Sequence, residues 1–176
     1  MTLTSVALAA LVMALAVQQV QTVPRVDLDR YLGEWHEVAR FPNRFQKSCA
    51  SDVIATYSKR DDGRIRVVNR CKMADGKIKD AEGVARVVDT ATNARLKVRF
   101  APAALSFLPF VWGDYWIIGL ADDYSWAVVG SPDREYLWIL ARRAQLDARS
   151  YDTALASARA QGFDVNKVVR TASTAP

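Results

Sequence analysis

The chain has 176 residues, of which 51% are hydrophobic and 24% charged, with a formal net charge of +5 at pH 7. A chain of this size and composition is expected to form one globular domain with an adequate core of its own. The basic residues are scattered among acids rather than clustered, so the charge favours a solvated exterior and argues against a nucleic-acid partner.

Residues 1–23 form an apolar leader without charge. The run from Ser5 to Val17 has the length of a signal peptide and is too short to span a membrane. Ala14-Leu15-Ala16 offers a cleavage site, although no basic residue precedes Arg25. We expect an export signal, with a merely apolar tail as the alternative, followed by a folded domain over residues 24–170.

Eight later segments alternate apolar and polar residues or form short apolar runs, and each is predicted to be a strand. They cover residues 35–40, 53–57, 65–70, 78–88, 95–100, 115–120, 126–130 and 136–141. In the fourth segment, Ala81, Gly83 and Ala85 share one face and charged residues share the other. Small residues inside and charges outside are what a barrel wall around a roomy interior requires.

One helix is predicted after the last strand. Asp147 has the character of an N-cap, Tyr151, Ala154 and Ala158 recur at helical spacing, and Gly162 ends the segment. Residues 171–176 are predicted to be a disordered tail. Eight strands in hairpin order predict an all-β fold, an eight-stranded antiparallel up-and-down β-barrel with one C-terminal α-helix packed on it.

The segment Gly33-Glu34-Trp35, at the first strand, and Arg142, after the last one, resemble the pattern of the lipocalin family. Other stretches, among them Asp27 to Gly33, Pro132 to Leu140 and Gln161 to Val165, are similar to its bacterial, apolipoprotein D-like branch. The resemblance implies that Trp35 plugs the closed end of the barrel and that Arg142 lies across it. Gly33 leaves room for the indole ring.

The two cysteines, Cys49 and Cys71, flank the hairpin of the second and third strands. Neighbours at the open end of a hairpin can meet disulfide geometry, and an exported chain meets an oxidising compartment. We expect a Cys49–Cys71 disulfide, with two free buried thiols as the alternative. Two cysteines and one histidine make no convincing metal site, and no cofactor is predicted. The leader has no cysteine, so the lipid anchor of some bacterial lipocalins is not expected.

The open end of the barrel is predicted to carry the ligand. Strand connections alternate between the two ends, which places the loops at 41–47, 72–76, 101–112 and 131–135 together. The loop 101–112 is apolar and contains two prolines; it is either a lid over the lumen or a membrane contact, and we expect a lid that touches membrane when open. The ligand-binding candidates are Ala39, Phe41, Tyr57, Asn69, Leu96, Val98, Phe100, Phe110, Trp112, Tyr115 and Trp138.

The expected function is binding, storage or transport of a lipophilic ligand. An apolar lumen suits an acyl chain, and the resemblance implies a fatty acid or lysophospholipid in the cell envelope. The protein would be periplasmic or secreted, with an outer-membrane association, as a monomer or homodimer. Cations near the mouth that could hold an anionic head group are Arg40, Arg44, Lys47, Arg70 and Lys72.

Two other functions compete with lipid carriage. The first is an enzyme on a lipocalin barrel, isomerase-like or lipid-hydrolysing, and the second is a membrane-docking or partner-binding module. No nucleophile motif is present, and His36, the sole histidine, is expected to be a packing or surface residue. Glu37 is expected to be a hydrogen-bonded structural acid. We therefore predict no catalytic residue and no enzyme activity.

Overall fold

The computed structural model describes residues 18–174, so the apolar run of the leader and its cleavage site lie outside the described residues. The strands are β1 (Gly33–Arg40), β2 (Cys49–Lys59), β3 (Ile65–Met73), β4 (Ile78–Val87), β5 (Arg95–Arg99), β6 (Gly113–Leu120), β7 (Trp126–Gly130), β8 (Leu137–Ala141) and β9 (Val169–Arg170). The helices are α1 (Leu28–Tyr31) and α2 (Ala148–Ala160), with short 3-10 turns at Arg44–Gln46, Ala103–Leu105, Pro109–Val111 and Val165–Lys167.

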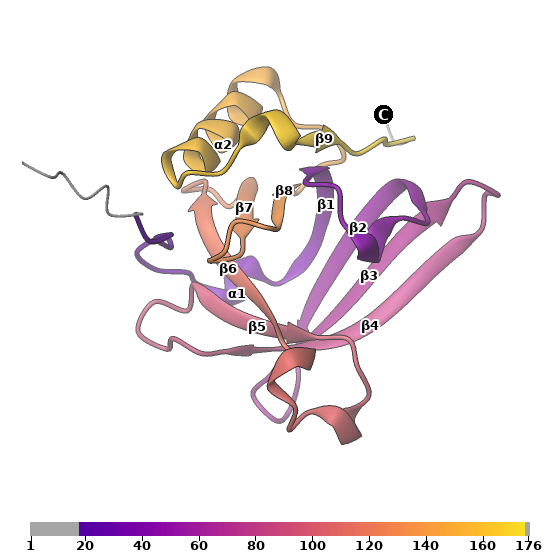
Figure 1. Cartoon of the computed structure of the whole chain (residues 1–176), viewed down its shortest axis with the longest axis vertical. Coiled ribbons are helices and arrows are strands. Elements are labelled where there is room, and N and C mark those ends of the chain that lie inside the picture. The colour runs from indigo at the N-terminus through magenta and orange to yellow at the C-terminus, as the bar shows by residue number, and fades with distance from the viewer. Residues whose placement is uncertain (1–17, 175–176) are drawn as a thin grey trace, which may run out of the picture.

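Strands β1 to β8 form a closed barrel (Figure 1). Each strand pairs antiparallel with its neighbour in the chain, from β2 through β8, and β1 pairs with both β8 and β2. A barrel closed in this way has no unpaired edge over the paired length. The predicted eight-stranded up-and-down barrel with a helix on its wall is therefore confirmed.

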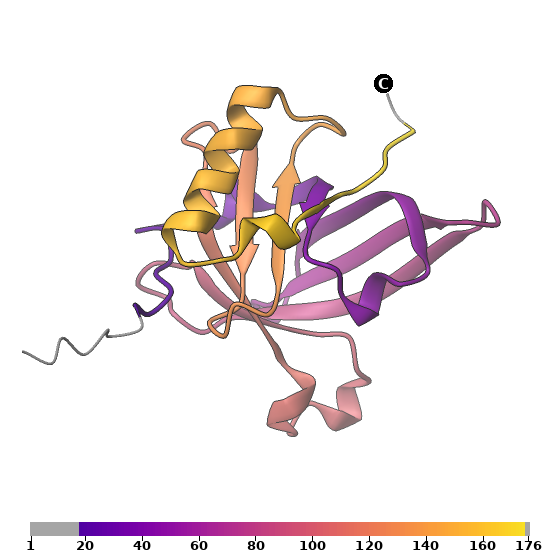
Figure 2. The same ribbon diagram turned by 45° about the horizontal axis from the view of Figure 1, so that its top comes forward.

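Helix α2 lies against the outer face of β6 and β7 (Figures 1 and 2). The Asp147 carboxylate accepts the amide of Ser150 and caps the helix, as predicted, and the buried stripe contains Tyr151, Ala154 and Ala158. Beyond the helix, the ring of Phe163 packs on the barrel wall where a Cβ at Gly130 would lie 2.5 Å from it. Glycine at this position is what allows the ring to reach the sheet.

Two apolar layers stabilise the fold. One lies between α2 and the barrel, and the other fills the barrel interior near its closed end. The interior layer contains large side chains that are completely buried, including Trp35, Val67, Ile117 and Val129. The half of the barrel near its closed end, called the lower half below, is thus a packed core. Any ligand must bind in the half near the open end, called the upper half.

Residues 18–23, which precede the expected start of the domain at residue 24, also contact the barrel. Val20 is 2% exposed and packs in the layer beside α2. The amide of Gln21 donates to the side chain of Gln161, and the amide of Val23 donates to the Ile117 carbonyl at 2.9 Å. These contacts secure residues 18–23 across the barrel.

Of the predicted C-terminal tail, residues 171–174 make hydrogen bonds to the barrel. The Thr171 amide donates to the Val38 carbonyl on β1, and the Asp52 amide on β2 donates to the Ala172 carbonyl, both at 2.9 Å. The segment therefore continues β9 between β1 and β2. Residues 175–176 lie outside the described residues.

Within residues 18–174, none of the helices combines the length and the apolar character that a membrane span needs.

Candidate ligand-binding site

The closed end has the geometry that the lipocalin resemblance implied. The guanidinium carbon of Arg142 lies 3.9 Å from the centre of the Trp35 ring, a cation–π contact. Arg142 also donates to the Glu34 carbonyl at 2.8 Å, and the indole N–H donates to the Tyr31 carbonyl at 2.8 Å. Gly33 has φ +91°, a conformation that glycine adopts without strain. Gly33, Trp35 and Arg142 thus lie together in the arrangement that the resemblance implied.

The strand register identifies the side chains that face the lumen. Partners directly opposite in an antiparallel sheet face the same side. Tyr57 lies opposite Val67, Asn69 opposite Ala55, and Leu96 opposite Tyr115. Val98 lies opposite Ala85, and the ring of Phe100 lies against Gly83. Among the ligand-binding candidates, the structure brings seven to the lumen: Tyr57, Asn69, Leu96, Val98, Phe100, Tyr115 and Trp138.

Exposure increases along these lumen residues toward the mouth. Tyr57 and Leu96 are 7% and 4% exposed, whereas Phe100 is 43% exposed. Asn69, Val98 and Tyr115 are partly exposed although they face inward. The upper half of the barrel is therefore reachable from solvent, and its wall is mainly apolar.

Two candidates, Ala39 and Phe41, face the helix instead of the lumen. A bulge between Glu37 and Ala39 adds one residue to β1, so that Ala39 lies opposite Ile139 in the layer under α2. Phe41 then packs on Phe163, with ring centroids 6.2 Å apart. An extra residue in one strand reverses the facing of the side chains beyond it.

Trp112, also a candidate, lies on the outer wall of the barrel. Tyr115 faces inward, so Gly113 does too, and Trp112 faces outward. The Trp112 ring lies between two arginines, with the guanidinium carbons of Arg86 and Arg99 4.4 Å and 5.3 Å from its centre. Its indole N–H donates to the Ser106 carbonyl at 2.8 Å, which attaches the 101–112 loop to this wall.

The 101–112 loop stands off the barrel rather than folding over the lumen (Figures 1 and 2). Phe107 and Phe110 are 78% and 79% exposed, and Leu105 is 39% exposed. Phe110 is thus not brought to the lumen, and the expected lid is not formed in this structure. The loop is an exposed apolar group held outside the barrel.

A polar network lies at the mouth, on the inner side of β1. The buried Glu37 carboxylate accepts hydrogen bonds from the Gln46 amide and the Thr171 hydroxyl, and Arg40 Nε lies 3.4 Å from it. The Gln46 side chain in turn accepts the indole N–H of Trp138 at 3.0 Å. Burial raises the pKa of the Glu37 carboxyl, and the hydrogen bonds oppose that shift. Glu37 is the hydrogen-bonded structural acid that we expected.

Of the five cations expected near the mouth, Arg40 is the one that the register turns inward, opposite Trp138. Arg70 faces outward and pairs with Asp80, and Lys72 lies opposite Ser51 on the outer side of β3. Arg44 and Lys47 are exposed on the loop between β1 and β2. An anionic head group in the mouth would therefore meet the guanidinium of Arg40.

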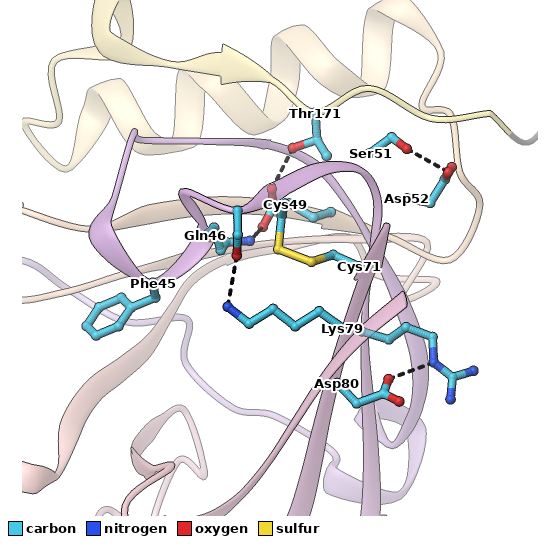
Figure 3. Close-up of a disulfide and its surroundings, with 12 residues drawn as sticks. Phe45, Gln46, Cys49, Ser51, Asp52, Cys71, Lys79, Asp80 and Thr171 are labelled. Carbon is cyan, nitrogen blue, oxygen red and sulfur yellow. Dashed lines mark hydrogen bonds and ion pairs between the residues drawn. A yellow bond between two sulfur atoms is a disulfide. The ribbon is translucent and has the colours of Figure 1, made fainter. Parts of the chain in front are cut away.

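Cys49 and Cys71 form the predicted disulfide, with an S–S distance of 2.01 Å and a Cα–Cα distance of 5.6 Å. Figure 3 shows the bridge beside Gln46 and below Thr171, so it lies next to the polar network of the mouth. The bridge joins the start of β2 to β3. Lys79 on β4 donates to Ser48 at 2.9 Å just before the bridge.

Three tyrosine hydroxyls meet in the lumen between its filled and its open part, and sequence reasoning did not identify them as a group. The Tyr115 hydroxyl lies 2.8 Å from that of Tyr31 and 2.9 Å from that of Tyr57. Burial raises the pKa of Tyr57 to about 12 and holds the pKa values of Tyr31 and Tyr115 well above the usual range. All three are neutral phenols at physiological pH. The residues come from α1, β2 and β6, so no local sequence signal links them.

His36, the sole histidine, does not face the lumen. It lies opposite Ile54 and Ala141, on the outer side of β1, with Nε2 3.3 Å from the Glu34 carboxylate. This is the surface role expected for it. Within residues 18–174, no group of three or more His, Cys, Asp or Glu side chains could hold a metal ion.

Comparison with known proteins gives a consistent result. The model of the lipocalin-like domain family matches residues 26–173. The chain is 38% identical over 156 residues to temperature-induced lipocalin-1 of Arabidopsis thaliana, covering 88% of this chain and 83% of the relative. It is 42% identical over 151 residues to the outer membrane lipoprotein Blc of Escherichia coli, covering 85% and 81%. Apolipoprotein D of Macaca fascicularis is 32% identical over 153 residues, with 82% and 76% covered.

Solved structures with little sequence identity share the fold. Apocrustacyanin C2 superposes with a TM-score of 0.67 at 17% identity, covering 85% of this chain and 81% of that one. Insecticyanin of the tobacco hornworm Manduca sexta superposes with a TM-score of 0.66 at 21% identity, covering 87% and 84%.

Proposed function

The chain belongs to the lipocalin family, in the branch of Blc and apolipoprotein D, and from this premise we propose that it binds a fatty acid or lysophospholipid in the upper lumen. Family and fold support the binding of a small hydrophobic molecule. The finer identity of that molecule rests on the chemistry of the lumen. Its acyl chain would lie along the apolar wall, with the anionic head group at the mouth.

The observation that carries this proposal is an inward-facing cation above an apolar, partly exposed wall. The side chain of Arg40 is 16% exposed, and Glu37 is its ion-pair partner among the described residues. A guanidinium offers five N–H donors, and Arg40 Nε, which lies 3.4 Å from the Glu37 carboxylate, is buried without a hydrogen-bond partner. The Glu37 carboxylate already accepts hydrogen bonds from Gln46 and Thr171, so it does not occupy all the donors of Arg40. Arg40 can therefore bind a carboxylate or phosphate with its remaining donors.

A paired substitution tests this placement. Arg40→Gln should weaken binding of a fluorescent fatty acid by about tenfold to a hundredfold, since a charge-assisted hydrogen bond contributes about 1.5–3 kcal/mol. Arg44→Gln, which removes an exposed cation of the same loop region, should leave the affinity unchanged. A fatty alcohol of equal length should bind both variants alike. Equal loss in the two variants, or none in either, would place the head group elsewhere.

The identity of the natural ligand can be measured directly. Protein purified from its native host should release a fatty acid or lysophospholipid into organic extract, detected by mass spectrometry. Extract without any lipid above the level of a boiled control would contradict the proposed cargo.

We place this activity in the cell envelope, at a membrane surface. The disulfide indicates an oxidising compartment, and the expected export signal agrees with it. The exposed apolar group of Leu105, Phe107 and Phe110 belongs to the loop that ends at Trp112, and the exposed Arg86 lies over the Trp112 ring on the outer wall. Apolar side chains beside cations suit an anionic membrane surface. The loop would thus bring the mouth to the lipid from which the ligand is taken or to which it is delivered.

No catalytic step is part of the proposal. The inward Glu37 has both carboxylate oxygens engaged by Gln46, Thr171 and Arg40, so it offers no free base to a ligand. His36 lies on the opposite side of β1. Binding and transfer are the functions for which the lumen is suited.

A further inference from the structure

The three phenol hydroxyls of the lumen form a hydrogen-bonded chain with Tyr115 at its centre. Tyr115 Oη contacts both Tyr31 Oη and Tyr57 Oη, whereas the outer two contact only Tyr115 among hydroxyl groups. The Tyr57 and Tyr115 rings lie edge to face with centroids 6.1 Å apart, and Tyr31 packs on Trp35 with centroids 4.9 Å apart. The packed rings fix the hydroxyl positions, so we refer to these residues as the tyrosine trio.

The tyrosine trio has more protons than it has hydrogen-bonded contacts. Three hydroxyls supply three protons, and their two contacts can use only two of them, since each hydrogen bond consumes one proton. In any orientation of the hydroxyls, one proton is left without an acceptor among the described protein atoms. A buried donor that stays unpaired is costly, so an acceptor from a ligand or a water in the lumen would stabilise this site.

Exposure indicates where that proton points. Tyr31 and Tyr57 are 4% and 7% exposed, while Tyr115 is partly exposed. When the two more buried residues both donate to Tyr115, its own proton is the unused one. Leu96 and Val98, which lie opposite Tyr115 and Gly113, supply an apolar wall beside it.

The surroundings favour a neutral acceptor. Burial holds the pKa values of all three phenols high, so this part of the lumen disfavours the phenolate and presents a neutral donor. A negatively charged group of a ligand would meet the same desolvation cost at this depth. A hydroxyl, ether or carbonyl oxygen would not.

We propose that the tyrosine trio is a second polar subsite, which binds an uncharged oxygen on the buried end of the ligand. This inference rests on the proposed function, because it assumes a lipid whose head group lies at the mouth near Arg40. It narrows the ligand class to lipids with an anionic head at one end and a hydroxyl, ether or carbonyl oxygen near the other. A plain acyl chain would instead press its methyl end against an unpaired donor.

The experiment compares a saturated fatty acid with its ω-hydroxy and ω-methoxy derivatives of equal chain length. The wild-type protein should bind both oxygenated lipids about tenfold more tightly than the plain one, which corresponds to 1.4 kcal/mol. The methoxy group can only accept a hydrogen bond, so its advantage would show that the protein supplies the proton.

Substitutions then assign the preference to the hydroxyls. The triple variant Tyr31→Phe/Tyr57→Phe/Tyr115→Phe should bind all three lipids alike, because no hydroxyl remains. Removing all partners by isosteric groups leaves no unpaired polar atom, so this variant should fold. Tyr57→Phe alone leaves two hydroxyls, one contact and one spare proton, and should keep the preference. Tyr136→Phe, at the mouth, is the matched control and should also keep it.

The outcomes separate this inference from the proposed function. Equal binding of the three lipids by the wild-type protein would overturn the subsite while leaving fatty-acid binding intact, and would assign the spare proton to a bound water. A preference that survives in the triple variant would also overturn it. If no lipid binds at all, the proposed function fails first. If the triple variant does not fold, a preference lost in Tyr57→Phe would contradict the proton count by itself.

Discussion

Strands β1 and β2, where the barrel closes, are joined by different contacts in the lower and upper halves of the barrel. In the lower half, Gly33 to His36 pair directly with Ile54 to Tyr57, and the space behind them is filled by Trp35. In the upper half the strands diverge, and residues 169–174 fill the gap by bonding to β1 on one side and to Asp52 of β2 on the other. The lower half rests on backbone pairing and apolar burial, the upper half on polar contacts.

Because of this difference, the two halves should respond differently to pH and to reducing agents. Apolar burial and the Arg142–Trp35 contact contain no group that titrates near neutral pH. The upper half depends on the carboxylates Glu37 and Asp52 and on a disulfide, so it responds to pH and to reducing agents. The ligand enters through the half that is held by these polar contacts. We therefore expect changes in the upper half to affect ligand exchange as well as stability, and changes at the Arg142–Trp35 contact to affect stability with little effect on ligand affinity.

Removal of the disulfide should have the largest effect. Cys49 and Cys71 are 22 residues apart, and the chain-entropy model gives about 3 kcal/mol for a loop of this size. Cys49→Ala/Cys71→Ala should lower the free energy of unfolding by that amount in urea titrations. The wild-type protein should also show no alkylatable thiol in non-reducing mass analysis. Two reactive thiols in the folded protein would show that the upper half does not need the bridge.

Arg142→Ala should have the next largest effect, confined to the closed end. A partly desolvated cation–π contact contributes about 1–2 kcal/mol, and here the bond to the Glu34 carbonyl is lost as well. The variant should have a lower Tm and an affinity for fatty acid within a few-fold of the wild-type value. Arg143→Ala, next to it in the sequence, is the control. Unchanged stability with lost binding would contradict the separation of the two halves.

The two carboxylates of the upper half should give opposite pH dependences. Hydrogen bonds, foremost from the Thr174 amide, lower the pKa of Asp52 from 3.8 to about 2, so its contribution is present above pH 3.8 and is lost as pH falls through about 2. Burial raises the pKa of Glu37 from 4.5, so its contribution is present below pH 4.5 and is lost as pH rises through the raised value.

Unfolding titrations at several pH values measure these contributions. The stability difference between wild type and Asp52→Asn should shrink as the pH is lowered toward 2. The wild-type protein should lose stability relative to Glu37→Gln as the pH is raised above 4.5. If both stability differences change in the same direction with pH, the Asp52 and Glu37 carboxylates do not contribute to stability as their contacts indicate.

Substitution of the exposed loop should have the smallest effect on stability. Phe107 and Phe110 are almost fully exposed, so Phe107→Ser/Phe110→Ser should change the free energy of unfolding by no more than about 0.5 kcal/mol. Transfer of a fluorescent fatty acid from anionic vesicles should nevertheless slow, and the wild-type rate should fall with salt. Ile78→Ser, which removes an exposed apolar side chain of β4, should transfer at the wild-type rate. A rate that is the same in all three proteins and independent of salt would exclude the loop from delivery.

The sequence alone was sufficient to predict the strands, the helix, the disulfide and the closed end. Strand alternation, the Asp147 cap and Gly162 are local signals, because they depend on backbone geometry over a few residues. Cys49 and Cys71 could be paired because a hairpin fixes their relative position. The lumen-facing residues of the regular strands β2 and β5, such as Tyr57 and Leu96, followed from alternation in the same way.

The tertiary structure decided the features for which no local signal exists. The bulge in β1 turns the side chain of Ala39 toward α2. The pairing of β5 with β6 after the 101–112 loop turns the side chain of Trp112 to the outer wall. The C-terminal segment is ordered only because the diverging strands leave donors and acceptors unpaired for it. The tyrosine trio brings together residues 84 and 58 positions apart, Tyr31 and Tyr57 with Tyr115. Contacts between distant segments depend on how the barrel closes, and alternation along one strand carries no information about that.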